Sequence, residues 1–372
     1  MAESFNIQQV NSDLQKAGAP WVAAETSMTR MTEEQRNRRL GFTPPPGELS
    51  VKEASIQFKA LEEAGQLDDI AASFATESIG APAAYDLRDV NGRDYTTAVK
   101  NQGGCGSCVA FASSAVLETS YRRFNPNEDI DVSEAQLFYC YGKEEGRNCS
   151  NGWWPEKAFD KVKAKGLTLE QFFPYTSGDQ NCNLANGYKE NVVNFGSMEK
   201  LDSTSKMKDW ISTRGSITGC FIVYEDFFSY SGGIYKHVSG EQQGGHCVEI
   251  IGYNNAERYW LCKNSWGTNW GDNGYFKIAY GQCRIEDWAG PYGVAGVSLL
   301  TWRNNLTCTG LWSNSSAKNA YASFDHGVGW RKLANNSEIE NHALLAALAA
   351  AKAANRKVNI HDDNGKIRTC YA

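Results

Sequence analysis

The stretch Gln102-Gly-Gly-Cys-Gly-Ser-Cys-Val-Ala-Phe111 decides how the rest of this chain is interpreted. It is a glycine-rich loop that ends in a cysteine, and apolar residues at helical spacing continue from there to about Phe124. Cys108 therefore stands at the N-terminus of a predicted helix, where first-turn N–H groups and the helix dipole favour a thiolate. The glycines let backbone N–H groups approach a substrate carbonyl, and Gln102 can place a side-chain N–H beside it. This pattern predicts a nucleophilic cysteine.

The pair Cys105-x-x-Cys108 has other interpretations. A zinc site needs a second pair of ligands at similar spacing, and the sequence has none. A thioredoxin-like dithiol needs a βαβ context, whereas a glycine-rich loop precedes this pair. From these residues alone, a buried structural cysteine stays open as the alternative to a nucleophile. We expect no metal and no cofactor.

A thiolate nucleophile needs an imidazole base, and that base needs an orienting group. His246 follows Gly244-Gly245 and opens a strand-like stretch, and Asn254-Asn255 predicts a hairpin that brings Asn264 roughly opposite it. The Asn264 oxygen can accept from one ring N–H and leave the other nitrogen facing the thiolate. A structural histidine is the alternative, which the glycine pair and the facing asparagine disfavour. The remaining histidines lie elsewhere: His237, His326, His342 and His361.

The composition of the whole chain limits the classes of protein to which it can belong. Its 372 residues are enough for two domains, and 41% hydrophobic with 22% charged residues is typical of a globular protein. A net charge of −6 argues against nucleic acid as the main partner. The longest apolar run, residues 343–351, is too short to span a bilayer, so we expect no membrane span.

The cysteines indicate the compartment. There are eleven, and in an oxidising environment an odd number predicts disulfide pairs and at least one free thiol. The first residues, Met1-Ala-Glu-Ser, lack the basic and apolar stretches of a secretory signal. We expect a secreted or lysosome-like location, with a signal peptide that this sequence does not include.

Residues 1–80 differ from the rest because they contain no cysteine. Two capping boxes, Thr32 with Gln35 and Ser50 with Glu53, start predicted helices that run to about Leu40 and about Glu63. The segment is either a helical N-terminal subdomain or a removable propeptide, and we predict an inhibitory propeptide. Residues 81–299 have a helical first half and a strand-rich second half, which predicts an α+β domain of two lobes.

Residues 300–372 differ from the preceding segments in charge, with nine basic and five acidic residues. Strand-like pieces flank one helix, which begins with the capping box Ser337/Glu340 and runs to about Asn355. We predict a small separate β-plus-helix domain, OB-like in its order of elements. Cys308 and Cys370 stand at its two ends and are a candidate disulfide by position alone. Its ligand or partner is unknown.

Three motifs in this order resemble the papain-like cysteine peptidases: Gln102 to Cys108, Gly244-Gly-His-Cys-Val-Glu-Ile-Ile-Gly-Tyr253, and Asn264-Ser-Trp-Gly-Thr-Asn-Trp-Gly. Residues 223–246 and Cys283-Arg-Ile-Glu286 are similar to the cathepsin B branch in particular. The resemblance implies a two-lobed fold with Cys108 as nucleophile, His246 as general base and then acid, and Asn264 as its orienting group. It implies an oxyanion hole made by Gln102 and the Cys108 N–H, with Trp266 shielding the histidine.

The resemblance also implies two disulfides, Cys105–Cys149 and Cys140–Cys182, while Cys220, Cys247, Cys262 and Cys283 have no clear family partners. Propeptides of this family run through the cleft in reverse and block it, and Trp21-Val-Ala-Ala-Glu-Thr-Ser resembles those near cathepsin B. The sequence departs from the family at Val109, where a tryptophan usually follows the nucleophile.

Four further residues are implied at the substrate subsites. Gly152 would offer its backbone to an extended substrate, and Trp153 and Trp154 would wall the adjoining pocket. Trp288 would form the floor of the S2 pocket, making it apolar and shallow, so that Val or Leu at P2 is preferred over Arg.

The function implied is that of a zymogen-derived cysteine endopeptidase that cleaves peptides through a thioester acyl-enzyme. No histidine occurs between Trp153 and Cys182, so the occluding loop of cathepsin B has no counterpart and endopeptidase action is expected. Two rival functions remain: an inactive homologue that binds partners through its C-terminal domain, and acyl transfer such as transglutamination.

Overall fold

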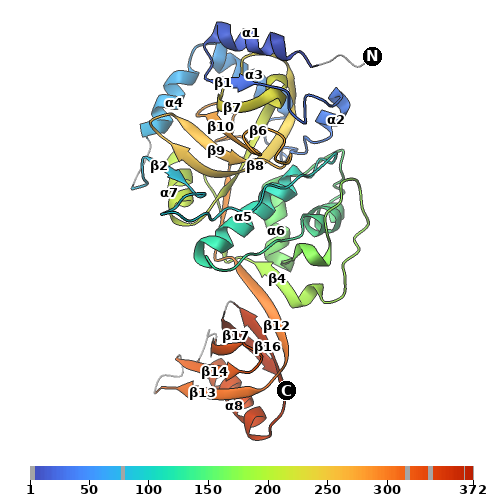
Figure 1. The fold of residues 1–372 in the computed structure, drawn as a ribbon, viewed down its shortest axis with the longest axis vertical. Helices are drawn as coiled ribbons and strands as arrows, with labels where there is room; N and C mark the ends of the chain where they lie inside the picture. The colour runs from blue at the N-terminus through green and yellow to red at the C-terminus, as the bar shows by residue number, and fades with distance from the viewer. Residues whose placement is uncertain (1–4, 77–79, 315–318, 334–337, 364, 372) are drawn as a thin grey trace. The chain divides into compact units, whose positions relative to one another are not determined.

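The computed structural model in Figure 1 describes residues 5–76, 80–314, 319–333, 338–363 and 365–371. The chain divides into two compact units, one of Met1–Leu184 with Phe195–Val297 and one of Ala185–Asn194 with Ser298–Ala372. The N-terminal segment thus folds onto the body that carries the peptidase motifs. The second unit takes in Ala185–Asn194 from upstream of the boundary expected at residue 300.

The first unit has a helical part built on α5, Cys108–Phe124. The predicted helix is confirmed, and most of its residues are buried, because the small residues Ala110, Ala112 and Ser113 let neighbouring elements approach it closely. Helix α6, Pro155–Lys165, packs against α5, and the π-helix η1, Gln136–Gly142, packs against α6.

The other part of the first unit is a nine-stranded sheet with the order β1-β7-β10-β9-β8-β6-β11-β5 and with β2 paired to β8. Strand β8 carries His246, and its antiparallel neighbour β6 places Phe221 opposite that histidine. The predicted hairpin of β8 and β9 is confirmed. The bounds are β1 Trp21–Ala23, β2 Ala84–Asp86, β5 Ser197–Lys200, β6 Ile217–Tyr224, β7 Tyr230–Tyr235, β8 Gln242–Asn254, β9 Tyr259–Lys263, β10 Tyr275–Ala279 and β11 Tyr292–Ala295.

The N-terminal segment consists of α1 Ile7–Ala17, β1, α2 Glu33–Asn37, α3 Val51–Glu63 and α4 Leu67–Thr76. Both predicted capping boxes are present, at Thr32 before α2 and at Ser50 before α3. Strand β1 pairs antiparallel with β7, and the Trp21 ring packs 5.2 Å from that of Tyr235. The segment is therefore docked on the sheet by a strand as well as by helices.

Among its described residues, the second unit has a sheet with the order β13-β14-β15-β17-β16-β12-β4, the helix α8, Glu338–Ala353, and the short 3₁₀ helix η3, Tyr188–Glu190. Helix α8 packs on one face of this sheet, where Leu348 and Ala351 join Phe324 and Ile360 in an apolar core. An OB-like order is not confirmed, and Ser337 of the predicted capping box lies outside the described residues. The strands are β4 Asn191–Asn194, β12 Ser298–Leu306, β13 Cys308–Ser313, β14 Ala320–Phe324, β15 Gly329–Leu333, β16 Val358–Asp363 and β17 Lys366–Tyr371.

A search of the described residues for a helix long and apolar enough to cross a membrane finds none.

Candidate active site

Cys108 is the first residue of α5 and is fully buried. The loop before it is held by the disulfide Cys105–Cys149, and the Gly106 N–H donates to the Cys149 carbonyl at 2.9 Å. A side chain at Gly106 would not fit, because an added Cβ would lie 2.7 Å from that carbonyl oxygen. The disulfide and the glycine together place the thiol at the positive end of the helix.

His246 and Asn264 are joined by a hydrogen bond of 2.8 Å between the ring Nε2 and the amide Oδ1. Asn264 follows the last residue of β9, Lys263, which pairs with Glu249, so its side chain reaches along the hairpin rather than straight across it. The Trp266 ring lies 4.6 Å from the imidazole and is itself buried. The sequence prediction that these three side chains meet is consistent with this geometry.

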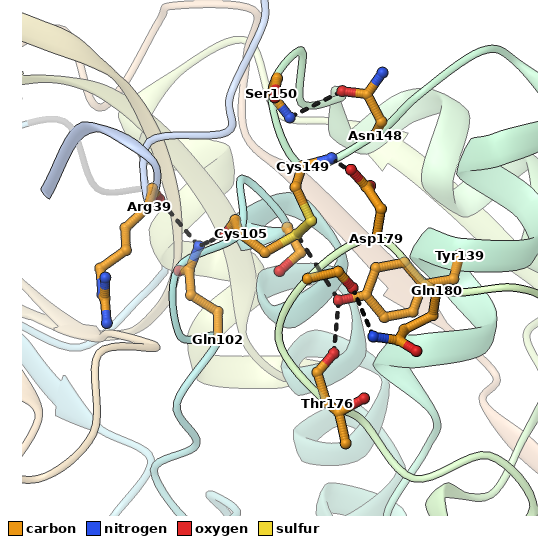
Figure 2. The surroundings of a disulfide bond; sticks show 12 residues. Arg39, Gln102, Cys105, Tyr139, Asn148, Cys149, Ser150, Thr176, Asp179 and Gln180 are labelled. Atoms are coloured by element: carbon orange, nitrogen blue, oxygen red, sulfur yellow. Dashed lines mark hydrogen bonds between the residues drawn. A yellow bond between two sulfur atoms is a disulfide. The ribbon is translucent and has the colours of Figure 1, made fainter. Parts of the chain in front are cut away.

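Gln102 is oriented by a residue that the sequence analysis missed. The Ser265 hydroxyl donates to Gln102 Oε1 at 2.7 Å, which fixes which end of the amide faces the nucleophile loop. Gln102 Nε2 then donates to the carbonyls of Cys105 at 2.8 Å and Arg39 at 3.0 Å (Figure 2). Nothing in the local pattern of Asn264-Ser265 predicts this contact, because the two partners are 163 residues apart.

A second missed residue is Tyr175. Its hydroxyl lies 2.7 Å from that of Ser107, the residue before the nucleophile, and donates to the Gln102 carbonyl at 2.8 Å. The Tyr175 hydroxyl therefore connects the start of α5 to the loop segment that carries Gln102. Its signal in the sequence is weak, since aromatic residues are frequent throughout this chain.

The N-terminal segment crosses the site as an extended strand. Phe42 N–H donates to the Gly245 carbonyl at 3.0 Å, and Trp153 exchanges two hydrogen bonds of 2.9 Å with Gly41 and Thr43. Gly41 comes so close that an added Cβ would lie 1.9 Å from the Gly106 carbonyl oxygen. Residues 39–43 therefore cover the loop that leads to Cys108.

The covering strand pairs with Trp153, through its N–H and C=O, and not with Gly152. The expectation that Gly152 offers its backbone to an extended substrate stays a prediction. Gly152 has a φ of +57°, and an added Cβ would lie 2.0 Å from the Gly41 carbonyl oxygen. Glycine is needed there so that the bound chain can approach, not because it donates to it.

The aromatic side chains around the strand divide into two groups. Phe42 is 3% exposed, and its ring meets that of Trp288 edge to face at 4.7 Å, so the pocket is deep enough to enclose an aromatic side chain. Trp153 and Trp154 were expected to wall this pocket. In the structure the Trp153 indole N–H donates to Glu145 at 3.2 Å, and the Trp154 ring lies 4.5 Å from the Arg147 guanidinium; their place at the pocket stays a prediction.

Burial sets the protonation of Cys108 and His246. It raises the pKa of the Cys108 thiol to about 12, although backbone N–H groups including that of Gly41 oppose the shift. Burial likewise lowers the pKa of His246 to about 4, against the opposing effect of the Asn264 hydrogen bond. A hydrogen bond with the Arg39 backbone opposes the lowering as well. The covered site therefore holds a neutral thiol and a neutral imidazole at pH 7.

The remaining cysteines are either paired in disulfides or free. The Cys105–Cys149 and Cys140–Cys182 disulfides are both present. Cys308 and Cys370, predicted to pair, are both free, and the Cys308 thiol points instead at the Gly310 carbonyl at 3.6 Å. That expectation rested on position at the ends of the segment, which does not fix the direction of a side chain in a sheet. Cys220, Cys247, Cys262 and Cys283 are buried and free.

No group of three or more metal-ligating side chains occurs among the residues that the structure describes.

Comparison with known proteins adds to this geometry. The model of the family described as papain family cysteine protease matches residues 81–290. A similar protein, cathepsin B-like CP2 of Giardia intestinalis, is 31% identical over 229 residues, which is 58% of this chain and 75% of that protein.

Two solved proforms have a similar fold. ProCathepsin B S9 from Trypanosoma congolense has a TM-score of 0.61 at 20% identity, covering 78% of this chain and 97% of that one. Digestive procathepsin L2 proteinase from the Tenebrio molitor larval midgut has a TM-score of 0.59 at 29% identity, covering 78% of this chain and 89% of that one. Both covered shares exceed the share of this chain that the family model matches.

Proposed function

This chain belongs to the papain family of cysteine proteases in its proform, and we propose that it hydrolyses internal peptide bonds through Cys108, His246 and Asn264 once its N-terminal segment is removed. The observation that carries the proposal is the hydrogen bond of 2.8 Å between His246 and Asn264, on the β-sheet side of a thiol at the start of α5. An imidazole fixed in this way can hold its other nitrogen toward a nucleophile.

The proposed reaction begins when His246 takes the proton of the Cys108 thiol. Sγ attacks the scissile carbonyl carbon, and the electron pair of the C=O bond moves onto oxygen. Gln102 Nε2 and the Cys108 N–H donate to this oxyanion. The C–N bond then breaks, His246 gives its proton to the leaving amine, and a thioester remains.

The second half of the reaction returns the enzyme. His246 takes a proton from water, whose oxygen attacks the thioester carbon and releases the carboxylic acid product. The thiolate leaves and forms an ion pair with the imidazolium. Support for the oxyanion hole comes from Gln102 Nε2, which donates to the Arg39 carbonyl of the covering strand at 3.0 Å. A peptide carbonyl is thus within the reach of this donor.

In this proposal the N-terminal segment of the chain inhibits the enzyme by occupying its substrate-binding cleft. It occupies the site with Gly41 over the nucleophile loop, and its carbonyls and N–H groups use the hydrogen-bonding groups that a substrate would need. We propose that protein or peptide substrates take its place after removal, with mature sequence starting near Ala81.

The substrate preference proposed is for an apolar P2 side chain. Phe42 packs against Trp288 in the position that such a side chain would take, and the Phe42 backbone pairs with Trp153. We therefore extend the expectation of Val or Leu to Phe, because the site encloses an aromatic ring. Arg is disfavoured, since an unpaired charge next to Trp288 would be costly to bury.

Profiling a peptide library with the processed enzyme tests these points. The expected result is cleavage inside peptides that carry Phe, Leu or Val at P2, one residue before the P1 residue whose bond is cut. Dominant Arg at P2, or release of C-terminal dipeptides alone, would overturn the proposed specificity. Added amines that appear in the products instead of water would favour acyl transfer, and an absence of any product would favour an inactive binding protein.

A secreted or lysosome-like location is also proposed, and the two disulfides support it, because the cytosol keeps most thiols reduced. Immunolocalisation in host cells tests it: staining confined to vesicles or the medium is expected, and diffuse cytosolic staining would contradict it.

A further inference from the structure

The sheet of the second unit has one face that α8 does not cover. Helix α8 packs against β13, β14, β15 and β17, and the side chains beneath it include Ala322, Phe324 and Leu333. Side chains alternate along a strand, so the residues between these point to the opposite face. Tyr321 and Ser323 of β14 are two of them, with Ala322 between them facing the helix.

Register extends this opposite face across four strands. Tyr321 pairs with Trp312 of β13 on one side and with Lys332 of β15 on the other, and Lys332 pairs with Lys366 of β17. Paired residues of neighbouring strands lie on the same face. Neighbouring strands are about 4.8 Å apart, so this row is roughly 14 Å long. A surface of this length matches a ligand of several linked rings rather than a ligand with a single small ring.

Trp330 adds a flat aromatic surface next to the row. It pairs with Ser323, which pairs in turn with Gly310, and its indole extends over both. An added Cβ at Gly310 would lie 2.9 Å from the six-membered ring of Trp330, so only glycine leaves room for the indole there. Trp330 is nevertheless 55% exposed and Trp312 is 48% exposed. Indoles held in place but left in water mark a recognition surface.

A second aromatic group continues the same face. Trp302 of β12 pairs with His361 of β16, and the two rings stack 4.7 Å apart at an interplanar angle of 8°. The Tyr371 ring lies 5.4 Å from Trp302 and is 55% exposed. Aromatic rings therefore stand on both sides of the two lysines.

The two lysines give this face its charge. Neither Lys332 nor Lys366 forms an ion pair within the described part of the chain, whereas the neighbouring Arg331 and Arg368 bind Asp362 and Asp363. Lys366 is exposed and Lys332 is partly exposed. Lys366 pairs in register with Asp363, but that carboxylate is already bound by Arg368, so the face keeps a net positive charge between aromatic rings. Such a face complements a ligand that carries both flat apolar surfaces and negative charge.

We propose that this face of the second unit binds an acidic polysaccharide. The apolar faces of the sugar rings would stack on Trp330 and Trp312, and the carboxylate or sulfate groups would pair with Lys332 and Lys366. A single-stranded nucleic acid also offers flat rings and negative charge. The polysaccharide is favoured because two disulfides point to a compartment outside the cytosol, where acidic polysaccharides rather than nucleic acids are the usual polyanions.

The test uses the full-length chain with Cys108→Ala, which prevents self-cleavage, and titrates it with polygalacturonate, neutral dextran and oligodeoxythymidylate. We expect binding of polygalacturonate that changes tryptophan fluorescence and weakens with salt. Trp330→Ala should lower the affinity at least about tenfold, as expected for one lost stacking ring. Lys332→Ala with Lys366→Ala should lower it further and flatten the salt dependence.

Two matched variants control for exposure and charge. Ile339→Ala removes an apolar side chain that is 81% exposed on α8, and Arg356→Ala removes an exposed positive charge after that helix. Both should leave the affinity unchanged, and thermal unfolding verifies that every variant is folded. Three results would overturn the proposal. The first is an unchanged affinity of Trp330→Ala for polygalacturonate. The others are tighter binding of oligodeoxythymidylate or dextran than of polygalacturonate, and no binding of any of the three polymers.

Discussion

Trp260, Trp270 and Trp288 of the first unit are at most 1% exposed, whereas Trp312 and Trp330 of the second are 48% and 55% exposed. The buried indoles support the site. Trp270 packs 4.9 Å from Trp266, which lies beside His246, and Trp288 encloses Phe42. The exposed indoles point away from the core of their own sheet. The same residue type therefore positions chemistry in one unit and presents a surface in the other, and burial distinguishes the two uses.

The largest effect that separates the units is expected from Cys108→Ala. This change removes the nucleophile, so peptide hydrolysis and self-processing should both be abolished, while polysaccharide binding by the second unit should not change. Fluorogenic peptide turnover and gel analysis of the purified chain measure the first two. Self-processing by the purified variant would show that Cys108 is not the nucleophile.

Gly41→Val should have the next largest effect, by exposing the site without cleavage of the chain. An added Cβ already lies 1.9 Å from the Gly106 carbonyl oxygen, so the covering strand must lift away from α5. We expect labelling of Cys108 by a thiol-reactive active-site probe in the uncut variant to rise by about two orders of magnitude, in line with the loss of several kcal/mol of docking energy.

Gly47→Val is the matched control for this variant, because an added Cβ at Gly47 meets no heavy atom within 4 Å. Its positive φ of +91° strains any side chain, so it reports backbone strain in the same segment without a clash over the nucleophile. Equal labelling of both variants would show that the segment is destabilised generally and that Gly41 has no special place.

Asn264→Ala should cost less than loss of the nucleophile, because the base itself remains. We expect kcat/KM to fall on the order of 10–100-fold, as the hydrogen bond that orients His246 is lost. Ser265→Ala is a useful comparison. It removes the hydrogen bond to Gln102 Oε1 and so changes kcat/KM through the proposed oxyanion hole, while the bond between His246 and Asn264 remains. A change of less than threefold for Asn264→Ala would contradict the orienting role.

The smallest effect on catalysis is expected from Trp330→Ala. The residue lies on the open face of the second unit, so kcat/KM for a short peptide should stay within about twofold of the unaltered enzyme, as is usual for an exposed substitution. A large loss of turnover on a short peptide would mean that the second unit contributes to the peptidase site, and the comparison between buried and exposed indoles would fail.

The parts of this fold that were predicted correctly have local signals. Cys108 at the start of α5 follows from the apolar spacing after it, and the helices after Thr32 and Ser50 follow from capping boxes that satisfy their own N–H groups. Each of these signals lies within one or two turns of chain, so no tertiary information is needed to interpret it.

The parts that were missed depend on distant partners. Strand β4 pairs with β12 of the second unit, more than a hundred residues later, and its sequence Asn-Val-Val-Asn carries no sign of that partner. The pairing of the covering strand with Trp153 depends on how closely Gly41 approaches Gly152, which only the packed strand determines. The predicted disulfide between Cys308 and Cys370 is absent, because sequence position does not specify the direction of their side chains.

The rate at which Cys108 reacts with iodoacetamide, measured against pH before and after removal of residues 1–80, tests the central claim most directly. In the covered chain, burial raises the pKa of the thiol to about 12, so the thiolate fraction should be small at pH 5–9 and the rate should rise only in strong alkali. Removal of the segment lets water and the His246 imidazolium stabilise the thiolate, so the rate should become high already at mildly acidic pH. Identical pH profiles for the two forms, with mass spectrometry showing the label on Cys108 in both, would contradict the account.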